Sequence, residues 1–180
     1  MKKLLPLLLI ALTPLTSSAY EQAFPKTASG TYEIKTLPEA RLIASKTDGA
    51  YFEGNNGLFR PLFRYIQAND IAMTTPVEAE MDPGVMYFYI GSDVDEAVLQ
   101  ETDRVSVHSA PERMVASLGV RGSYSESNFE EASIKLKEWL RKNKDYKAIG
   151  EPRGIFWNGP YVPGFIKRFE VHIPVRKVEE

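Results

Sequence analysis

The chain has no cysteine and only two histidines, His108 and His172. Without cysteine, disulfides, thiol catalysis and thiolate–metal sites are excluded, so the folded state must depend on its core alone. Neither histidine belongs to a His-x-x-x-His or Glu-x-x-His pattern, so there is no recognisable ligand spacing for a zinc or di-iron site. We expect each histidine to be a surface residue or a satisfied core residue.

Sequence signatures of catalysis and of nucleotide binding are also missing. There is no Gly-x-Ser-x-Gly elbow, no Walker loop and no Gly-x-Gly-x-x-Gly, and no spacing pairs two carboxylates as in a glycosidase. The 22 basic residues face 24 acidic ones, so there is no basic excess for nucleic acid or anionic lipid. The sequence therefore carries no recognised signature of a hydrolase, a nucleotide-binding enzyme or a nucleic-acid-binding protein.

Residues 1–19 have the features of an export signal. Lys2 and Lys3 precede an apolar run of about a dozen residues, too short for a bilayer span of roughly 20, and Ser-Ser-Ala at 17–19 offers a cleavage site before Tyr20. A buried or interfacial helix is the alternative. Cleavage would move the net charge from −2 to about −4. We expect an exported protein without stable membrane insertion, periplasmic in a two-membrane bacterium and otherwise secreted.

The remaining chain suits one domain, residues 31–180, after an N-terminal extension of residues 20–30. Two segments 73 residues apart share a Pro-Glu pair and a similar apolar pattern, beginning at Leu37 in the first copy. We interpret them as internal repeats of about 31–91 and 104–176, with chance similarity as the alternative. No linker separates the two copies, which predicts one pseudo-symmetric domain.

Each repeat is predicted as strand, strand, helix, strand, strand. A capping box at Ser127–Glu130 is predicted to begin the second helix. Runs of strands with only two main helices favour an α+β domain with an antiparallel sheet, rolled into a distorted open barrel. The expected strands are Tyr32–Lys35, Arg41–Thr47, Ile71–Met81, Val85–Ile90, Val105–Ser109, Met114–Arg121, Gly154–Trp157 and Phe165–Val175. In the last of these, Phe169, Val171, Ile173 and Val175 should face one way, and Arg168, Glu170 and His172 the other.

Several segments resemble one known family. They are Tyr32–Ile34, the helical Leu62–Ile66, the Ile-Ala-Met-Thr-Thr-Pro-Val segment Ile71–Val77, and Arg168–Val175. On these residues the chain resembles the SOUL haem-binding proteins in a bacterial, exported form, over roughly Tyr32 to Val175. The last segment is also similar to the terminal strand of GyrI-like effector-binding domains. The resemblance implies a distorted barrel of two strand–helix repeats that binds haem or another tetrapyrrole without an established catalytic step.

The first helix offers candidate residues for such a ligand. Haem is an apolar plate with two propionates, and it needs an apolar groove, cations at the rim and, for tight iron binding, an axial donor. Leu58, Leu62 or Ile66 would supply the groove. Arg60 and Arg64 share one helix side and would hold carboxylates. The alternatives are core packing for the apolar stripe and a solvated face for the arginines.

Two residues are weak candidates for an axial metal ligand, Met73 and His172. For Met73 the alternative is core packing. The first repeat contains no histidine, and His172 stands where the family pattern usually has an aromatic residue. The sequence therefore predicts weak, non-covalent tetrapyrrole binding, with a role in transport, buffering or sensing.

Glu170 has two interpretations. By resemblance to the effector-binding domains, it would accept hydrogen bonds or charge from a ligand in a cleft between the repeats. Alternatively, it pairs with a basic neighbour such as Arg168 or Lys167.

Three other functions stay open. One is an effector-type domain for amphipathic or cationic small molecules. Another is a hydrolase or haem-modifying enzyme that uses Glu170 or Tyr161 for proton transfer. The third is an interaction domain whose pocket is filled by side chains. No protein partner follows from the sequence.

Overall fold

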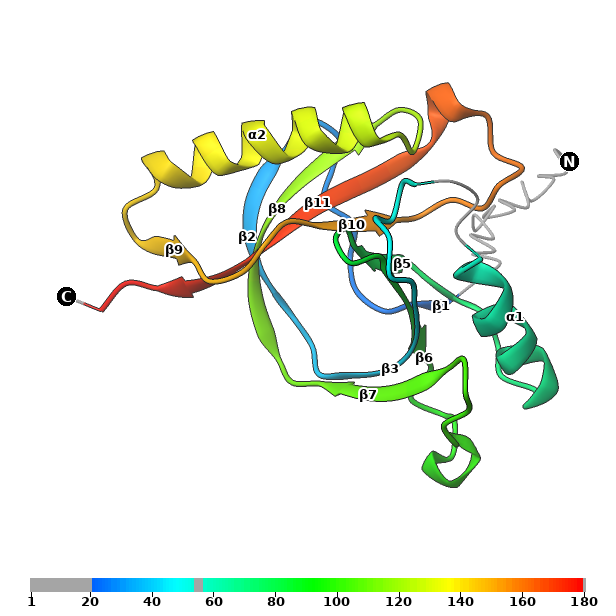
Figure 1. The fold of residues 1–180 in the computed structure, drawn as a ribbon. Coiled ribbons are helices and arrows are strands. Elements are labelled where there is room, and N and C mark those ends of the chain that lie inside the picture. The colour runs from blue at the N-terminus through cyan, green and yellow to red at the C-terminus, as the bar shows by residue number, and fades with distance from the viewer. Residues whose placement is uncertain (1–20, 54–56, 180) are drawn as a thin grey trace, which may run out of the picture.

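The predicted strands form one strongly curved antiparallel sheet (Figure 1). The computed structural model describes residues 21–53 and 57–179. Together with helices α1 (Phe59–Ala68) and α2 (Glu126–Lys142), the sheet confirms an α+β fold. Its strands are β2 (Tyr32–Leu37), β3 (Ala40–Lys46), β5 (Val77–Glu80), β6 (Val85–Ile90), β7 (Ser106–Ala110), β8 (Arg113–Arg121), β9 (Tyr146–Ala148), β10 (Arg153–Phe156) and β11 (Arg168–Lys177).

The strand order of the sheet is symmetric, because corresponding strands of the two halves of the chain occupy equivalent positions on either side of its centre. It runs β2-β8-β11-β10-β5-β6-β3-β7, with β9 paired to the end of β11. The first strand of each half pairs with the second strand of the other half, and β5 joins β10 at the centre. This order is compatible with the internal repeat, which stays a prediction. Strands β1 (Glu21–Gln22) and β4 (Thr74–Thr75) form a separate parallel pair.

Both helices pack on the same face of the sheet. Helix α1 contacts β3, and α2 contacts β8 and β11. Phe169, Val171 and Ile173 of β11 lie in the core beneath α2, as their predicted alternation requires. Ile43 and Phe88 lie in the core with α1. The opposite face, called the inner face below, therefore has neither of these helices over it.

Two local predictions need correction. The N-cap of α2 is Ser125, two residues before the predicted N-cap Ser127, and its side chain accepts a hydrogen bond from the amide of Asn128 at 3.3 Å. The predicted strand Ile71–Met81 is divided into β4 and β5 at Pro76. Proline has no N–H for a strand ladder, so the pairing breaks there.

The predicted export signal, residues 1–19, lies outside the described residues. Among the residues that are described, no helix is long and apolar enough to cross a membrane.

Candidate functional site

The inner face of the sheet carries two buried carboxylates, Glu170 of β11 and Glu78 of β5, each 1% exposed. They are held on adjacent parts of one surface because Ile155 of β10 lies opposite both of them in the strand register. Apolar side chains surround them. These are Leu37, Leu42, Tyr89, Val115, Ile155 and Trp157.

Glu170 is the most heavily hydrogen-bonded carboxylate of the described residues. Burying an ionised carboxylate is costly unless its oxygens are paired, and here both oxygens accept several bonds. Only one partner, Lys35, carries a permanent charge. The donors are Thr27 N at 2.8 Å, Thr27 Oγ1 at 3.0 Å, Lys35 Nζ at 2.7 Å, Ser117 Oγ at 3.0 Å, Trp157 Nε1 at 2.7 Å and His172 Nε2 at 2.7 Å.

The pKa values of Glu170 and His172 are both lowered, so at neutral pH Glu170 is ionised and His172 is neutral. Burial opposes ionisation of Glu170, but the hydrogen bond from His172 and the nearby Lys35 outweigh it and lower its pKa to about 2. Burial lowers the pKa of His172, so its ring is neutral. An ionised Glu170 only accepts, so Nε2 of His172 carries the proton. Nδ1 is then a buried acceptor with no hydrogen-bond partner among the described residues.

Glu78 is neutralised differently. Arg113 Nη2 lies 2.8 Å from one oxygen and Arg153 Nη1 lies 2.7 Å from the other, and the Tyr89 hydroxyl also donates to this carboxylate. Burial acts to raise the pKa of Glu78, but the two guanidinium groups lower it overall. All of these partners come from strands of the sheet. Glu78 is therefore fixed entirely within the sheet.

An N-terminal segment, residues 21–31, covers the inner face at Glu170. In Figure 1 it runs from β1 to the start of β2 in dark blue. Phe24 is buried against the rings of Tyr89 and Trp157, with both centroids 5.5 Å away. The segment approaches β8 so closely that a Cβ on Gly119 would lie 2.3 Å from the carbonyl oxygen of Ala28. A larger residue than glycine at 119 would push the segment away.

A second region is an open groove beside α1, about 660 Å³ in volume. Arg60, Arg64 and Arg104 line it, all three are exposed, and none forms an ion pair within the described chain. None of the described lining residues carries a carboxylate. The other lining residues are Gly57, Pro61, Tyr65, Ala68, Asn69, Gln100, Thr102 and Val105. The described lining of this α1 groove is therefore positive.

The structure separates the residues that the sequence suggested for one ligand site. Leu58, Leu62 and Ile66 are buried beneath α1 and do not line its groove. Met73 is half-buried against the same core. Arg60 and Arg64 are brought together, and Arg104 joins them from another part of the chain. Glu170 and His172 lie instead on the inner face, and no group of three or more metal-ligating side chains occurs in the described chain.

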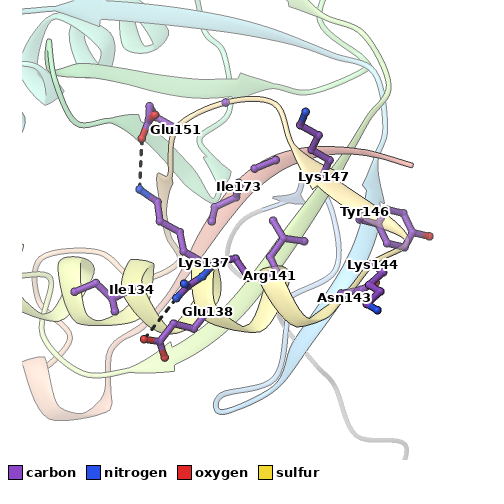
Figure 2. Close-up of a pocket in the computed structure, with 13 residues that line it drawn as sticks. Ile134, Lys137, Glu138, Arg141, Asn143, Lys144, Tyr146, Lys147, Glu151 and Ile173 are labelled. Atoms are coloured by element: carbon purple, nitrogen blue, oxygen red, sulfur yellow. Dashed lines mark ion pairs between the residues drawn. The ribbon is translucent and has the colours of Figure 1, made fainter. Parts of the chain in front are cut away.

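Figure 2 shows a third region, a groove of about 810 Å³ between α2 and the β9 loop. Its cations are partly balanced, because Lys137 lies 3.6 Å from Glu151 and Arg141 lies 3.9 Å from Glu138. This α2 groove has an apolar floor that includes Leu140 and Ile173. It serves below as a control surface for the α1 groove.

The described domain matches a known family over nearly its whole length. The sequence profile of the family described as SOUL heme-binding protein matches residues 18–174. The chain belongs to the SOUL haem-binding protein family. No curated protein sequence matches it.

Three solved structures share the fold. EcmrR, in a DNA complex, matches with a TM-score of 0.66 and 16% identity, over 82% of this chain and 58% of that chain. This SOUL chain therefore spans little more than half the length of EcmrR. A hydrolase from Listeria innocua has a TM-score of 0.61 and 12% identity over 83% and 94% of the two chains. SAV2435 bound to tetraphenylphosphonium has a TM-score of 0.50 and 11% identity over 81% and 94%. At these identities the likeness shows the fold alone.

No sequence pattern pointed to the Glu78 cluster. Glu78 stands in a predicted strand, but Arg113 and Arg153 lie 35 and 75 residues further along the chain. Only the sheet register brings them together. The partners expected for Glu170, Arg168 and Lys167, are also replaced by a distant one, Lys35. One signal was available for Glu170, namely a charged residue inside an otherwise apolar strand.

Proposed function

We propose that this SOUL protein binds haem or another carboxylated tetrapyrrole, non-covalently and without transforming it, in the α1 groove. The observation that carries the site is the set of three arginines in a lining whose described residues include no carboxylate. Guanidinium groups bind carboxylates through paired hydrogen bonds. Membership of the haem-binding family supports the ligand class.

The residues of the α1 groove fit the propionates of a tetrapyrrole better than its iron. Pro61, Ala68 and Val105 offer apolar contacts beside the arginines. Of the groove's described residues, only Tyr65 has a side-chain oxygen of the type that ligates haem iron. That hydroxyl already donates to the Gln100 carbonyl at 2.9 Å and accepts from the Gln100 amide at 2.9 Å. We therefore propose weak binding in which the propionates, and not the iron, provide the specificity.

Titration with haemin and with iron-free protoporphyrin IX tests this proposal. Both should give saturable absorbance changes at micromolar protein, with dissociation constants within about threefold of each other. A protein that shows no saturable Soret change with haemin at these concentrations does not have the proposed function. Strong discrimination in favour of haemin would replace propionate recognition with iron ligation.

A proton-transfer enzyme is less consistent with the inner face. A general acid needs a pKa near the working pH, whereas the pKa of Glu170 is lowered to about 2. Tyr161 is 98% exposed on a loop, so it does not share a water-excluded site with Glu170.

Export of the mature protein is part of the proposal, because residues 1–19 carry the charge, apolar run and small residues of a signal. N-terminal sequencing of protein from the extracytoplasmic fraction should begin at Tyr20. An intact Met1 in that fraction would contradict cleavage.

A further inference from the structure

The loop between β10 and β11, residues 157–167, leaves large apolar side chains in solvent. Tyr161 is 98% exposed, Phe165 is 76% exposed and Ile166 is 43% exposed. The two prolines of the loop are exposed as well. In Figure 1 this β10–β11 loop is coloured orange and projects at the upper right of the molecule. Single exposed apolar residues are ordinary, whereas a cluster of them marks an interaction site.

The β10–β11 loop is held in one shape at both of its ends. The Tyr124 hydroxyl accepts a hydrogen bond from the Asn158 amide at 2.7 Å and donates one to the Arg168 carbonyl at 2.7 Å. The Asn158 side chain accepts a third from the Arg168 amide at 2.6 Å. Near the tip, a Cβ on Gly164 would lie 2.3 Å from Ser123 Oγ, so the loop packs directly on this serine. The exposed side chains are therefore presented on a fixed backbone, and docking them costs little ordering entropy.

Three cations at the base of the loop have no ion-pair partner among the described residues. Arg121 and Arg168 are exposed and lie directly opposite each other in the pairing of β8 with β11. Like charges in this position repel each other. Neither of them forms an ion pair, and nor does Lys167, which lies over the Tyr124 ring at 4.7 Å. An anionic surface beside the two arginines would relieve their repulsion.

An anionic membrane surface fits this combination better than a protein partner does. Aromatic and aliphatic side chains enter the boundary between lipid headgroups and acyl chains, while neighbouring cations meet the phosphates. A stable protein interface takes about 20 to 30 residues a side, and a projecting loop offers far fewer. The chain as a whole carries a net charge of −2, so anionic lipid repels the rest of the molecule and orients this loop toward the bilayer.

We propose that the β10–β11 loop docks this protein on a membrane surface that contains anionic phospholipid. Tyr161, Phe165 and Ile166 enter the headgroup region, and Arg121 and Arg168 contact the lipid phosphates. The contact is interfacial and needs no membrane-spanning helix. It is separate from the α1 groove and does not rest on tetrapyrrole binding there.

Sedimentation with vesicles tests the proposal on the chain from Tyr20 onwards, which contains every described element of the fold and lacks the predicted signal. The wild type should bind vesicles of phosphatidylcholine mixed with phosphatidylglycerol, and should bind pure phosphatidylcholine at least tenfold more weakly. Tyr161→Ser/Phe165→Ser should weaken binding to the mixed vesicles about tenfold. The matched control Ile134→Ser/Ile149→Ser removes two side chains that are each 59% exposed elsewhere, and it should bind like the wild type. A wild type that does not sediment with the mixed vesicles, or an equal loss in both variants, would overturn the proposal.

The contribution of charge is tested by a second pair of variants. Arg121→Gln/Arg168→Gln should weaken binding to the mixed vesicles about tenfold, because basic residues at an anionic surface add to the attraction. Lys137→Gln/Arg141→Gln removes the same charge from the α2 groove and should bind within about threefold of the wild type. Equal losses would mean that net charge alone drives binding, which would contradict docking through the loop.

A fluorescent label reports whether the loop itself enters the lipid, and it decides the question if a double variant fails to fold. Because the chain has no cysteine, Phe165→Cys and the control Ile149→Cys each carry one nitrobenzoxadiazole label at a defined position. Emission at position 165 should rise severalfold with the mixed vesicles, and emission at 149 should stay nearly constant. No rise at 165, or the same rise at both positions, would refute the docking. Haemin affinity should be the same in all these variants, so failure here is distinguishable from failure of the α1 groove.

Discussion

The inner face and the α1 groove differ in whether their charged side chains are paired. On the inner face, each of the two buried carboxylates is met by cations and donors at 3.0 Å or less. In the α1 groove, Arg60, Arg64 and Arg104 line an open surface with no carboxylate among its described residues. Satisfied buried charges are costly to disturb, whereas unpaired exposed ones cost little to change.

This difference separates stability from ligand binding. Substitutions on the inner face should change the free energy of unfolding, and those in the α1 groove should change affinity with little effect on folding. Within the inner face there is a second difference. The partners of Glu78 come only from the sheet, whereas Glu170 also accepts a hydrogen bond from the Thr27 amide of the N-terminal segment.

The largest expected effect on stability is at Glu78. Glu78→Gln leaves Arg113 and Arg153 without their buried counter-charge, and breaking such a pair costs about 3 to 5 kcal/mol. Because both arginines are partly exposed, the lower end of this range is expected in urea unfolding. Glu80→Gln, a half-buried change beside it, is the matched control and should cost less than about 1 kcal/mol. Equal losses from the two variants would remove the special role of Glu78.

Glu170→Gln should cost less, about 2 kcal/mol, because only one of its partners carries a permanent charge and the others lose charge-assisted bonds. The same urea unfolding experiment measures it. Haemin affinity should not change, since the α1 groove does not include Glu170. A variant with normal stability and weakened haemin binding would place the tetrapyrrole on the inner face.

Stability should fall in two steps as the pH is lowered. Burial lowers the pKa of His172 below 6.5, so the unfolded chain binds a proton that the folded protein excludes, and stability is lost as the pH falls through 6.5. The lowered pKa of Glu170, about 2 against 4.5 when unperturbed, gives stability that is present above pH 4.5 and lost between 4.5 and 2. Urea midpoints from pH 8 to 3 measure both steps. His172→Gln should remove only the first step, and a wild-type curve that is flat from pH 7 to 5 would contradict a neutral buried His172.

The fold was predictable from the sequence to a large extent, because alternating apolar residues mark strands and a helical stripe marks α1. Phe169, Val171 and Ile173 point into the core as expected. The inner face was not predictable. The sequence predicts residues 20–30 as an extension, because they carry no periodic pattern, yet Phe24 and Thr27 complete the surface around Glu170. Contacts that join distant positions follow from strand register, which the local pattern does not encode.

The smallest expected effect on stability is in the α1 groove, and it tests the central proposal most directly. Haemin should be titrated into the wild type, Arg60→Ala/Arg64→Ala and the matched control Lys137→Ala/Arg141→Ala from the α2 groove. The two double variants should unfold within about 0.5 kcal/mol of the wild type per substitution, because all four residues are exposed. Wild type and control should bind haemin equally, and the α1 variant should bind at least tenfold more weakly. Unchanged binding in the α1 variant, or an equal loss in both, would contradict tetrapyrrole recognition by Arg60 and Arg64.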